Sequence, residues 1–399
     1  MNIFSMRMTP RLGVAVVAAG LVATAGCSSS SSSSSSSPGT ASPSASASST
    51  ASASASDSAL SVKQIVLGTT LKHSFQPNGK GATATESLSQ PDDIVALGGN
   101  LYVGFQNGVG SQGEASTSGN LDSTLVEFTP SGSVVKQWDV TGKIDGMGAD
   151  AATGQVFATV NEDSKSSLYA VSGGTVTHYT YATPLPHMGG TDAVAVDNGK
   201  ILISASAPGT SGKAPASAPA VFAVTLNAGA KTATVAPFFA DNATATGVNG
   251  SSNGKKMTLA LTDPDSNGVV PSTSPLFGGD FVLNSQGDEE LIFSGASGQN
   301  LQVLKISNSV DDIAWATSTT GTLYTSDASS NTVDAITGTF TPGTAYTAVT
   351  PCNANSAPST CPAPGYPANT LGTIDLTTGK VGTVATSGPV TPKGMIFVP

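Results

Sequence analysis

Arginine is almost absent from this sequence of 399 residues. Its two arginines, Arg7 and Arg11, lie near the N-terminus, so residues 27–399 carry 14 lysines against 26 aspartates and glutamates, a formal charge of −12. Nucleic-acid binding depends on basic patches that displace counterions from phosphates, and a bidentate grip on phosphate or carboxylate depends on the planar guanidinium. We therefore expect no nucleic-acid binding and disfavour anionic ligands, while neutral, cationic and polyol ligands remain open.

Cysteine is also scarce, with three in the chain. Cys352 and Cys361 flank a loop rich in proline, asparagine and serine, and no histidine or further cysteine pair lies near them, which argues against a metal site. An exported chain meets oxidising conditions. We expect a disulfide here, and closing a loop of about ten residues contributes roughly 2.5–3 kcal/mol.

The N-terminus has the order of a secretory signal peptide: Arg7 and Arg11, then an uncharged apolar run over residues 12–25, then Gly26 and Cys27. The run is shorter than the roughly 20 residues that a permanent membrane span needs. Residues 24–27, Thr-Ala-Gly-Cys, resemble a lipobox, although that family usually has leucine where Thr24 stands. The resemblance implies a lipoprotein in which Cys27 becomes the acylated N-terminus, carrying palmitate-type chains. The alternative is an ordinary signal peptide cut near Ala25.

Residues 28–58 contain almost nothing but Ser, Ala, Thr, Pro and Gly. Such a stretch has no apolar surface to bury, and we expect a disordered tether with a reach of roughly 30 Å. A flexible stalk next to an acylated cysteine is a coherent anchoring device. The expected organisation is a signal peptide at 1–26, a lipidated cysteine and tether at 27–58, and one domain at 59–399, held at the outer face of the cytoplasmic membrane.

From residue 59 onward the sequence lacks any long stretch with helical periodicity. Short runs of β-branched and aromatic residues alternate instead with Gly, Asn, Asp and Ser. Charged residues make up 11% of the chain and aromatic residues 6%, and there are 45 glycines. This balance is typical of an all-β domain with many tight turns.

A repeat within this region predicts the architecture. Six segments follow or approximate the form x-Asp-small-aliphatic, at residues 91–94, 144–147, 191–194, 245–248, 310–313 and 392–395. Their second positions are 47 to 82 residues apart, and strand-like runs and polar turns follow each start. Four antiparallel strands in about 50 residues make one β-propeller blade. The pattern predicts six blades, and a seventh remains open if the 82-residue interval contains a degenerate one.

The two ends of the domain are expected to complete one blade together. The last unit begins at residue 392 and has room for one strand, while the strand-like run at 63–67 precedes the first unit and belongs to none. A sixth blade built from both termini would close the ring and protect the edges that an open sheet exposes.

The unit that begins at residue 310 resembles a blade of the NHL-repeat and gluconolactonase-like propellers. It reads Val-Asp-Asp-Ile-Ala at 310–314, Gly-Thr-Leu-Tyr at 321–324 and Asn-Thr-Val at 331–333. The resemblance covers the domain loosely and is strong in this unit and in the one that begins at residue 91. It implies a propeller architecture. This superfold supports hydrolases, lyases, electron-transfer proteins and binding modules, so the motifs do not specify a chemistry.

The second position of each repeat is expected to lie near the mouth of the central channel. The occupants are Asp92, Asp145, Asp192, Thr246, Asp311 and Lys393. Converging carboxylates could hold a divalent cation through oxygen ligands. Alternatively, each Asp accepts hydrogen bonds from nearby backbone N–H groups and fixes the start of its strand. The second interpretation explains why most blades share the residue.

The resemblance sharpens the question of a metal. It implies ligands from a Glu on the first inner strand, two Asn and an Asp. The first unit here has no Glu, Asp311 stands where the family commonly has Asn, and Lys393 stands where it would have Asp. These departures argue against a metal-dependent lactonase, and we expect no cofactor. One calcium candidate remains at residues 263–268, Asp-Pro-Asp-Ser-Asn-Gly, but its twelfth position is Ser274 instead of Glu.

His187 lies in a loop a few residues before an inner strand, where a propeller lyase or hydrolase would want a base. A lone loop histidine is more often exposed and without a role. Because the sequence contains no catalytic constellation, we expect a monomeric, non-enzymatic module that binds a small molecule, glycan or protein through its channel mouth or its long polar loops. The alternative is a gluconolactonase-like hydrolase or lyase acting on a small cyclic or carbohydrate ester.

Overall fold

The computed structural model describes residues 59–186, 189–206, 217–350 and 369–399. The chain divides into two units, Met1–Ala55 and Ser56–Pro399, and the described residues belong to the second. The expected lipidation at Cys27, the disulfide between Cys352 and Cys361, and His187 lie outside them. Helical segments in the described ranges are short 3₁₀ turns, and none is long and apolar enough to cross a membrane. The all-β prediction is confirmed.

Three antiparallel groups of four strands follow one another along the first half of the domain. The first consists of β4 (Pro91–Leu97), β5 (Asn100–Phe105), β6 (Asp122–Phe128) and β7 (Val134–Thr141). The second consists of β8 (Ile144–Asp150), β9 (Gln155–Val160), β10 (Ser167–Ser172) and β11 (Thr175–Tyr181). The third consists of β12 (Val194–Asp197), β13 (Lys200–Ser204), β14 (Pro219–Asn227) and β15 (Thr232–Ala240), and β15 also pairs in parallel with β11.

The fourth group corrects the predicted repeat. Its order from the centre outward is β18 (Pro264–Val269), β19 (Phe281–Ser285), β20 (Glu290–Ser294), β21 (Gln302–Lys305), β16 (Thr244–Gly247) and β17 (Lys256–Thr258). The segment at 245–248, expected to be an inner strand, lies at the periphery, so Thr246 is far from the axis. Residues 263–268, expected to be a turn or a calcium loop, form most of the innermost strand instead.

The last two groups exchange strands. One contains β22 (Val310–Trp315), β25 (Ala345–Val349), β26 (Thr370–Ile374) and β27 (Val381–Thr383). The other contains β28 (Met395–Val398), β23 (Thr322–Asp327), β24 (Thr332–Thr337) and β1 (Ser61–Leu67). The pieces at 322–337 were expected to belong to the unit that begins at residue 310. They pair instead with β28 and β1, which come from the two ends of the domain. The sequence had predicted that these two ends share a sheet.

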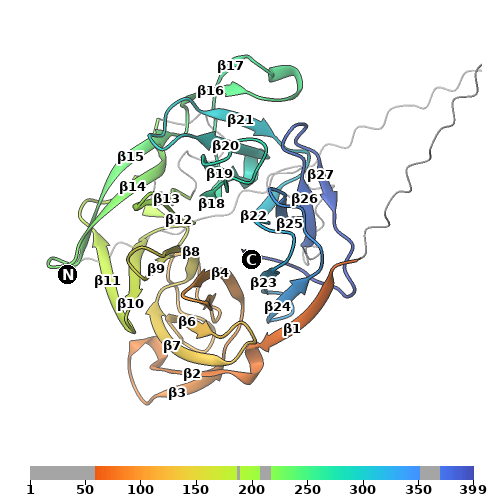
Figure 1. The fold of residues 1–399 in the computed structure, drawn as a ribbon. Coiled ribbons are helices and arrows are strands. Elements are labelled where there is room, and N and C mark those ends of the chain that lie inside the picture. The colour runs from red at the N-terminus through yellow and green to blue at the C-terminus, as the bar shows by residue number, and fades with distance from the viewer. Residues whose placement is uncertain (1–58, 187–188, 207–216, 351–368) are drawn as a thin grey trace, which may run out of the picture. The chain divides into compact units, whose positions relative to one another are not determined.

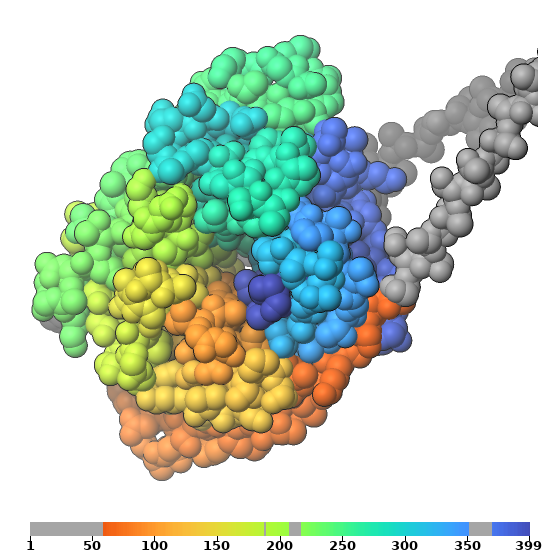
Figure 2. Space-filling model, in the orientation of Figure 1, coloured from red at the N-terminus to blue at the C-terminus, as the bar shows by residue number. Residues whose placement is uncertain are grey.

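The innermost strands form a closed circuit around a common axis (Figure 1). β4 lies beside β8, β8 beside β12, β12 beside β18, β18 beside β22, β22 beside β28, and β28 beside β4. In the space-filling view the C-terminal segment, in dark blue, occupies the middle of the face between the orange and blue sheets (Figure 2). This arrangement is that of a β-propeller. A hairpin of β2 (Lys72–Phe75) and β3 (Ala84–Ser87) lies outside the circuit next to β7, where Gln137 Nε2 donates to the carbonyl of Lys72 at 2.9 Å.

The apolar core is divided among the spaces between neighbouring sheets. Between the first two groups, Leu125 packs with Val156, and between the next two, Phe157 packs with Ile203. Each remaining pair of neighbours, including the first and last sheets, shares a cluster of the same kind. Successive side chains of a strand point to opposite faces of its sheet, so each sheet can place apolar side chains on both faces. Each sheet is therefore stabilised mainly by its two neighbours.

Two glycines let inner strands approach closely. A Cβ on Gly146 would lie 2.3 Å from the carbonyl oxygen of Asp192, and one on Gly394 would lie 2.5 Å from the carbonyl oxygen of Asp92. Real Cβ atoms do not come this close to backbone. The glycines that follow Asp145 and Lys393 in the repeat are therefore required by contact with the next inner strand, and this contact keeps the channel narrow.

Replacement of Phe397 by Ala should destabilise the domain by about 3–4 kcal/mol, because it leaves a cavity in a buried cluster. Phe397 is 7% exposed on β28, and its ring meets Phe340 edge to face at 5.0 Å. Val135→Ala, at a residue 51% exposed on β7, should change stability by less than about 0.5 kcal/mol. Chemical denaturation of the two variants measures the difference. If the two variants were equally stable, the packing of β28 against its neighbours would not be what stabilises the closed ring.

Candidate functional site

A cavity of about 380 Å³ lies on the axis, lined by all six innermost strands. Asp93 and Asp312 also line it, and near the start of those strands it is surrounded by one charged side chain from the equivalent position of each. They are Asp92, Asp145, Asp192, Asp265, Asp311 and Lys393. Asp92, Asp145, Asp265 and Asp311 are the second residues of their strands, whereas Asp192 and Lys393 lie two residues before theirs. The common position in the repeat brings these charges together, and we call them the axial ring.

Asp265 is the member of the axial ring that sequence analysis missed, and Thr246 was wrongly expected in its place. A signal for it existed. Pro264, Asp265 and Ser266 carry the x-Asp-small pattern, and Asp265 precedes Asp311 by 46 residues, close to the spacing between Asp145 and Asp192. The Asp-x-Asp-x-Asn-Gly motif concealed this match because it suggested a turn.

Lys393 connects two neighbours in the axial ring. Its Nζ lies 3.1 Å from Asp311 Oδ1 and 3.4 Å from Asp92 Oδ1. The second oxygen of Asp311 accepts from Asn369 Nδ2 at 3.2 Å, and the second oxygen of Asp92 accepts from Gln106 Nε2. Burial lowers the pKa of Lys393, but the charges of Asp311 and Asp92 more than offset this and raise it well above its ordinary value. Lys393 is therefore charged and neutralises part of this side of the ring.

A second lysine, Lys143, forms an ion pair with Asp145. Lys143 Nζ lies 3.3 Å from Asp145 Oδ1 and also pairs with Glu162. Burial raises the pKa of Asp145, but the charge of Lys143, together with the effects of Glu162, Lys393 and Asp92, outweighs burial and holds that pKa well below its ordinary value. Burial and the charge of Asp145 raise the pKa of Glu162 to about 8. The two carboxyl groups thus differ in protonation near neutral pH, the arrangement that acid–base catalysis uses.

Asp192 differs from these residues. It is 9% exposed, it lines the cavity, and no hydrogen bond or ion pair within the described ranges reaches its carboxylate. Burial raises its pKa well above the ordinary value, and the charges of Asp145 and Asp265 add to the effect. A buried carboxylate without a partner carries the full cost of desolvation. A cation placed beside it would remove part of that cost.

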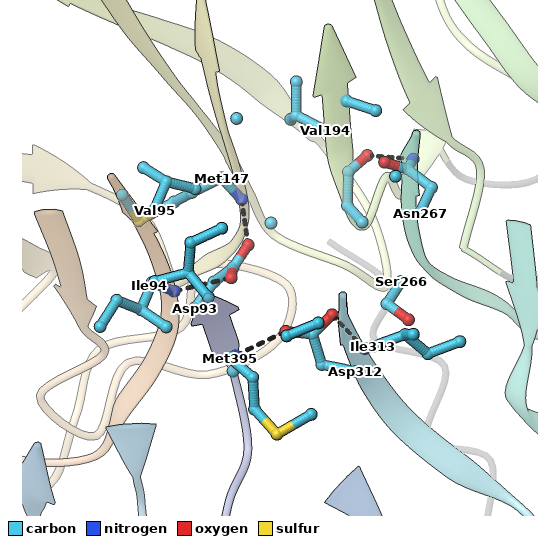
Figure 3. A pocket seen from close by; sticks show the side chains of 18 of the residues that line it. Asp93, Ile94, Val95, Met147, Val194, Ser266, Asn267, Asp312, Ile313 and Met395 are labelled. Carbon is cyan, nitrogen blue, oxygen red and sulfur yellow. Dashed lines mark hydrogen bonds between the residues drawn. The ribbon is translucent and has the colours of Figure 1, made fainter. Parts of the chain in front are cut away.

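In two units of the repeat, the residue at the third position, and not the one at the second, bonds to backbone N–H groups. Asp93 accepts from Ile94 N at 2.6 Å and from Met147 N of the neighbouring strand at 2.5 Å (Figure 3). Asp312 repeats the device, accepting from Ile313 N at 2.7 Å and from Met395 N at 2.6 Å. The structural role that the sequence suggested for Asp92 and Asp311 therefore belongs to the following residue. The side chains at the second positions are left to face the axis.

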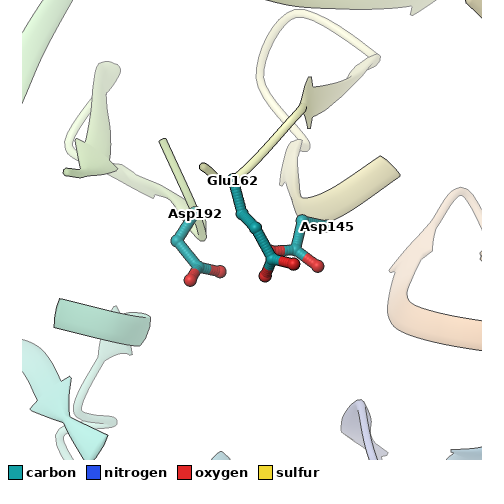
Figure 4. A group of neighbouring side chains, drawn as sticks. All are labelled: Asp145, Glu162 and Asp192. Atoms are coloured by element: carbon teal, nitrogen blue, oxygen red, sulfur yellow. The ribbon is translucent and has the colours of Figure 1, made fainter. Parts of the chain in front are cut away.

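Three carboxylates are close enough to share a metal ion. Ligand oxygens of Asp145, Glu162 and Asp192 lie within 4.8 Å of one another, and the side chains extend toward the same space (Figure 4). Lys143 already contacts Asp145 and Glu162, so a metal ion there would sit beside an ammonium group. A small number of acidic side chains can bind a cation in this way, but their proximity alone does not identify one.

Comparison with known proteins gives fold-level likeness. No family model matches the sequence, and no curated protein matches it. A protein of unknown function from Bacteroides caccae is similar over 86% of this chain and 99% of its own, at 9% identity and a TM-score of 0.45. A streptogramin B lyase is similar over 81% of this chain and 76% of its own, at 10% identity and 0.39. A luciferin-regenerating enzyme covers 68% and 86%, at 12% identity and 0.34. Likeness this distant carries no argument about activity.

Glu162→Gln should change how stability depends on pH. Because the pKa of Glu162 is about 8 in the folded protein and about 4.5 in an unfolded chain, the folded state binds the proton more tightly, and stability falls as pH rises from about 4.5 to 8. Because glutamine does not titrate, the variant lacks this loss of stability. The variant should gain on the order of 4 kcal/mol relative to the wild type between pH 5 and pH 9. Thermal melting across this range tests it, and parallel curves for the two proteins would contradict the assignment.

Proposed function

We propose that this protein is a lipid-anchored β-propeller of six blades that binds a small ligand in its axial cavity, outside the cytoplasmic membrane. The observation that carries the proposal is the cavity itself. The side chains of the axial ring converge on it, and Asp192 is buried there with no hydrogen-bond or ion-pair partner among the residues that the structure describes. Concave sites with a few convergent polar groups of perturbed pKa are the usual form of a ligand site.

The circuit of innermost strands and the six interfaces between described sheets support the proposal of six blades. The anchor rests on sequence: Cys27 at the end of an apolar run, followed by the serine-rich residues 28–58. A tether of that length would let the domain reach ligands at some distance from the lipid surface. The expected state is a monomer whose partners are the membrane, through the lipid, and the ligand of the cavity.

A hydrolase or lyase acting on a small cyclic or carbohydrate ester is the second candidate. One observation favours it: Glu162, with a pKa of about 8, lies beside the ionised Asp145 at the cavity. Such a pair could donate and accept a proton in a single turnover. We rank it second because the axial ring has no Ser, Cys or His nucleophile, and because Lys143 already pairs with two of the three carboxylates that could share a metal ion.

Gly268→Phe should abolish ligand binding without unfolding the domain. Gly268 lines the cavity on β18, and a Cβ there would meet nothing within 4 Å, so the aromatic ring would fill the ligand space. Gly295→Phe, also in open space but outside the cavity lining, is the matched control. Each protein is incubated with an envelope extract, and bound small molecules are identified by mass spectrometry. Recovery of the same compounds from both variants would place binding elsewhere.

Cys27→Ser should release the protein from the membrane without changing the melting temperature of the domain. The lipid is the expected anchor, and residues 28–58 separate it from the fold. Fractionation of cells that express either protein tests this. Membrane retention of the variant at the wild-type level would contradict the lipoprotein assignment.

A further inference from the structure

The charges around the cavity divide into a compensated part and an uncompensated part. Lys393 lies against Asp92 and Asp311, and Lys143 lies against Asp145 and Glu162. Asp192 is contacted by neither, and one carboxylate oxygen of Asp265, on the next inner strand, is buried without a hydrogen-bond partner. A bound cation would therefore offset the uncompensated negative charge if it lay between β8, β12 and β18, on the Asp192 side of the axis.

Beyond the ring the same cavity has an apolar part, alongside the polar side chains of Asp93, Asp312, Ser266 and Asn267. The inner strands contribute hydrophobic side chains along the axis, among them Met147, Val194, Val196, Val269, Trp315 and Phe397. Met147 and Val194 belong to β8 and β12, the strands that flank Asp192, and both appear in the wall of the cavity (Figure 3). An occupant that fills this space therefore needs an apolar body as well as a positive charge.

A metal ion satisfies these conditions less well than an organic cation. Two of the three carboxylates within reach of one another already pair with Lys143, whose charge would repel a divalent ion about as strongly as one of them attracts it. A bare ion would also leave the apolar length of the cavity without an occupant. An alkylammonium group needs a single carboxylate as counter-ion and can bury its chain against the inner strands.

We infer that the axial cavity takes a small organic ammonium ion with an apolar substituent, with Asp192 as its counter-ion. This inference rests on the proposed function and names the chemical class of the ligand. The ammonium group donates hydrogen bonds to the Asp192 carboxylate near the axial ring, and the substituent extends along the axis past Met147 and Val194. Neutral and anionic molecules of the same size lack the charge that this carboxylate requires.

Calorimetric titration with n-butylammonium tests the inference, with n-butanol, butyrate and calcium chloride as comparison ligands. We expect n-butylammonium to bind the wild type at pH 7.5, and n-butanol and butyrate to bind at least tenfold more weakly. Asp192→Asn should lose binding of n-butylammonium by tenfold or more. Asp197→Asn makes the same change at a buried residue of β12, the strand that begins two residues after Asp192, and Asp197 does not line the cavity. This variant should bind like the wild type.

A series from methylammonium to n-butylammonium tests the apolar wall. Affinity should rise about fourfold with each methylene, which corresponds to about 0.8 kcal/mol per buried CH₂. A flat series would overturn the assignment of the apolar substituent. Binding of calcium that depends on Asp192 and exceeds that of n-butylammonium would overturn the organic ligand in favour of a metal ion.

The outcomes separate this inference from the proposed function. If n-butanol binds as well as n-butylammonium, and Gly268→Phe abolishes both, the cavity is a ligand site but its ligand is not a cation. If the envelope compounds that the wild type retains are also retained by Gly268→Phe, the cavity is not the binding site and the proposed function fails as well. Melting curves of all variants establish that each one is folded.

Discussion

The arrangement at the axis depends on the ion pairs that Lys393 makes with Asp92 and Asp311. Lys393 precedes the last strand of the chain, and its two partners lie on the inner strands on either side. The same closing strand is tied to β22 through Asp312, whose carboxylate accepts from Met395 N. Because removal of one partner from a buried pair leaves an uncompensated charge, these contacts fix where the ring closes. They also determine which carboxylates remain without a cation.

The closure of the ring of sheets and the kind of ligand proposed for the cavity thus both depend on how the charges are distributed around the axis. Lys393 pairs with Asp92 and Asp311 on the strands that flank β28. Lys143 pairs with Asp145 and Glu162 at the second sheet. Asp192 lies beyond both cations within a wall that becomes apolar farther along the axis. An enzyme of this fold would need a nucleophile or a bound metal at this point. A binding module needs only a complementary charge and shape, which is why we rank it first.

Much of this arrangement could be predicted from the sequence, because the composition and the spacing of the repeat are similar throughout the domain. The all-β class and the convergence of Asp92, Asp145, Asp192, Asp311 and Lys393 follow from a repeat whose members occupy equivalent positions. Asp265 was missed because its segment also matched a turn motif. The placement of residues 322–337 was missed because local sequence cannot tell which of two adjacent sheets a strand joins. The roles of Gln106, Lys143 and Glu162 come from loops and turns, which the repeat does not describe.

The exchange of strands between the last two sheets has a consequence for how the domain reaches its folded state. The sheet made of β28, β23, β24 and β1 draws on three segments, of which the first is more than two hundred residues from the second, and the second is separated from the third by residues 338–394. Long-range pairing of this kind slows folding, since the entropy of closing the intervening chain is lost before the contacts form. β28 also follows the other described strands in the sequence. The ring therefore stays open until residues 395–398 are available, and until they pair, β23 keeps an accessible edge.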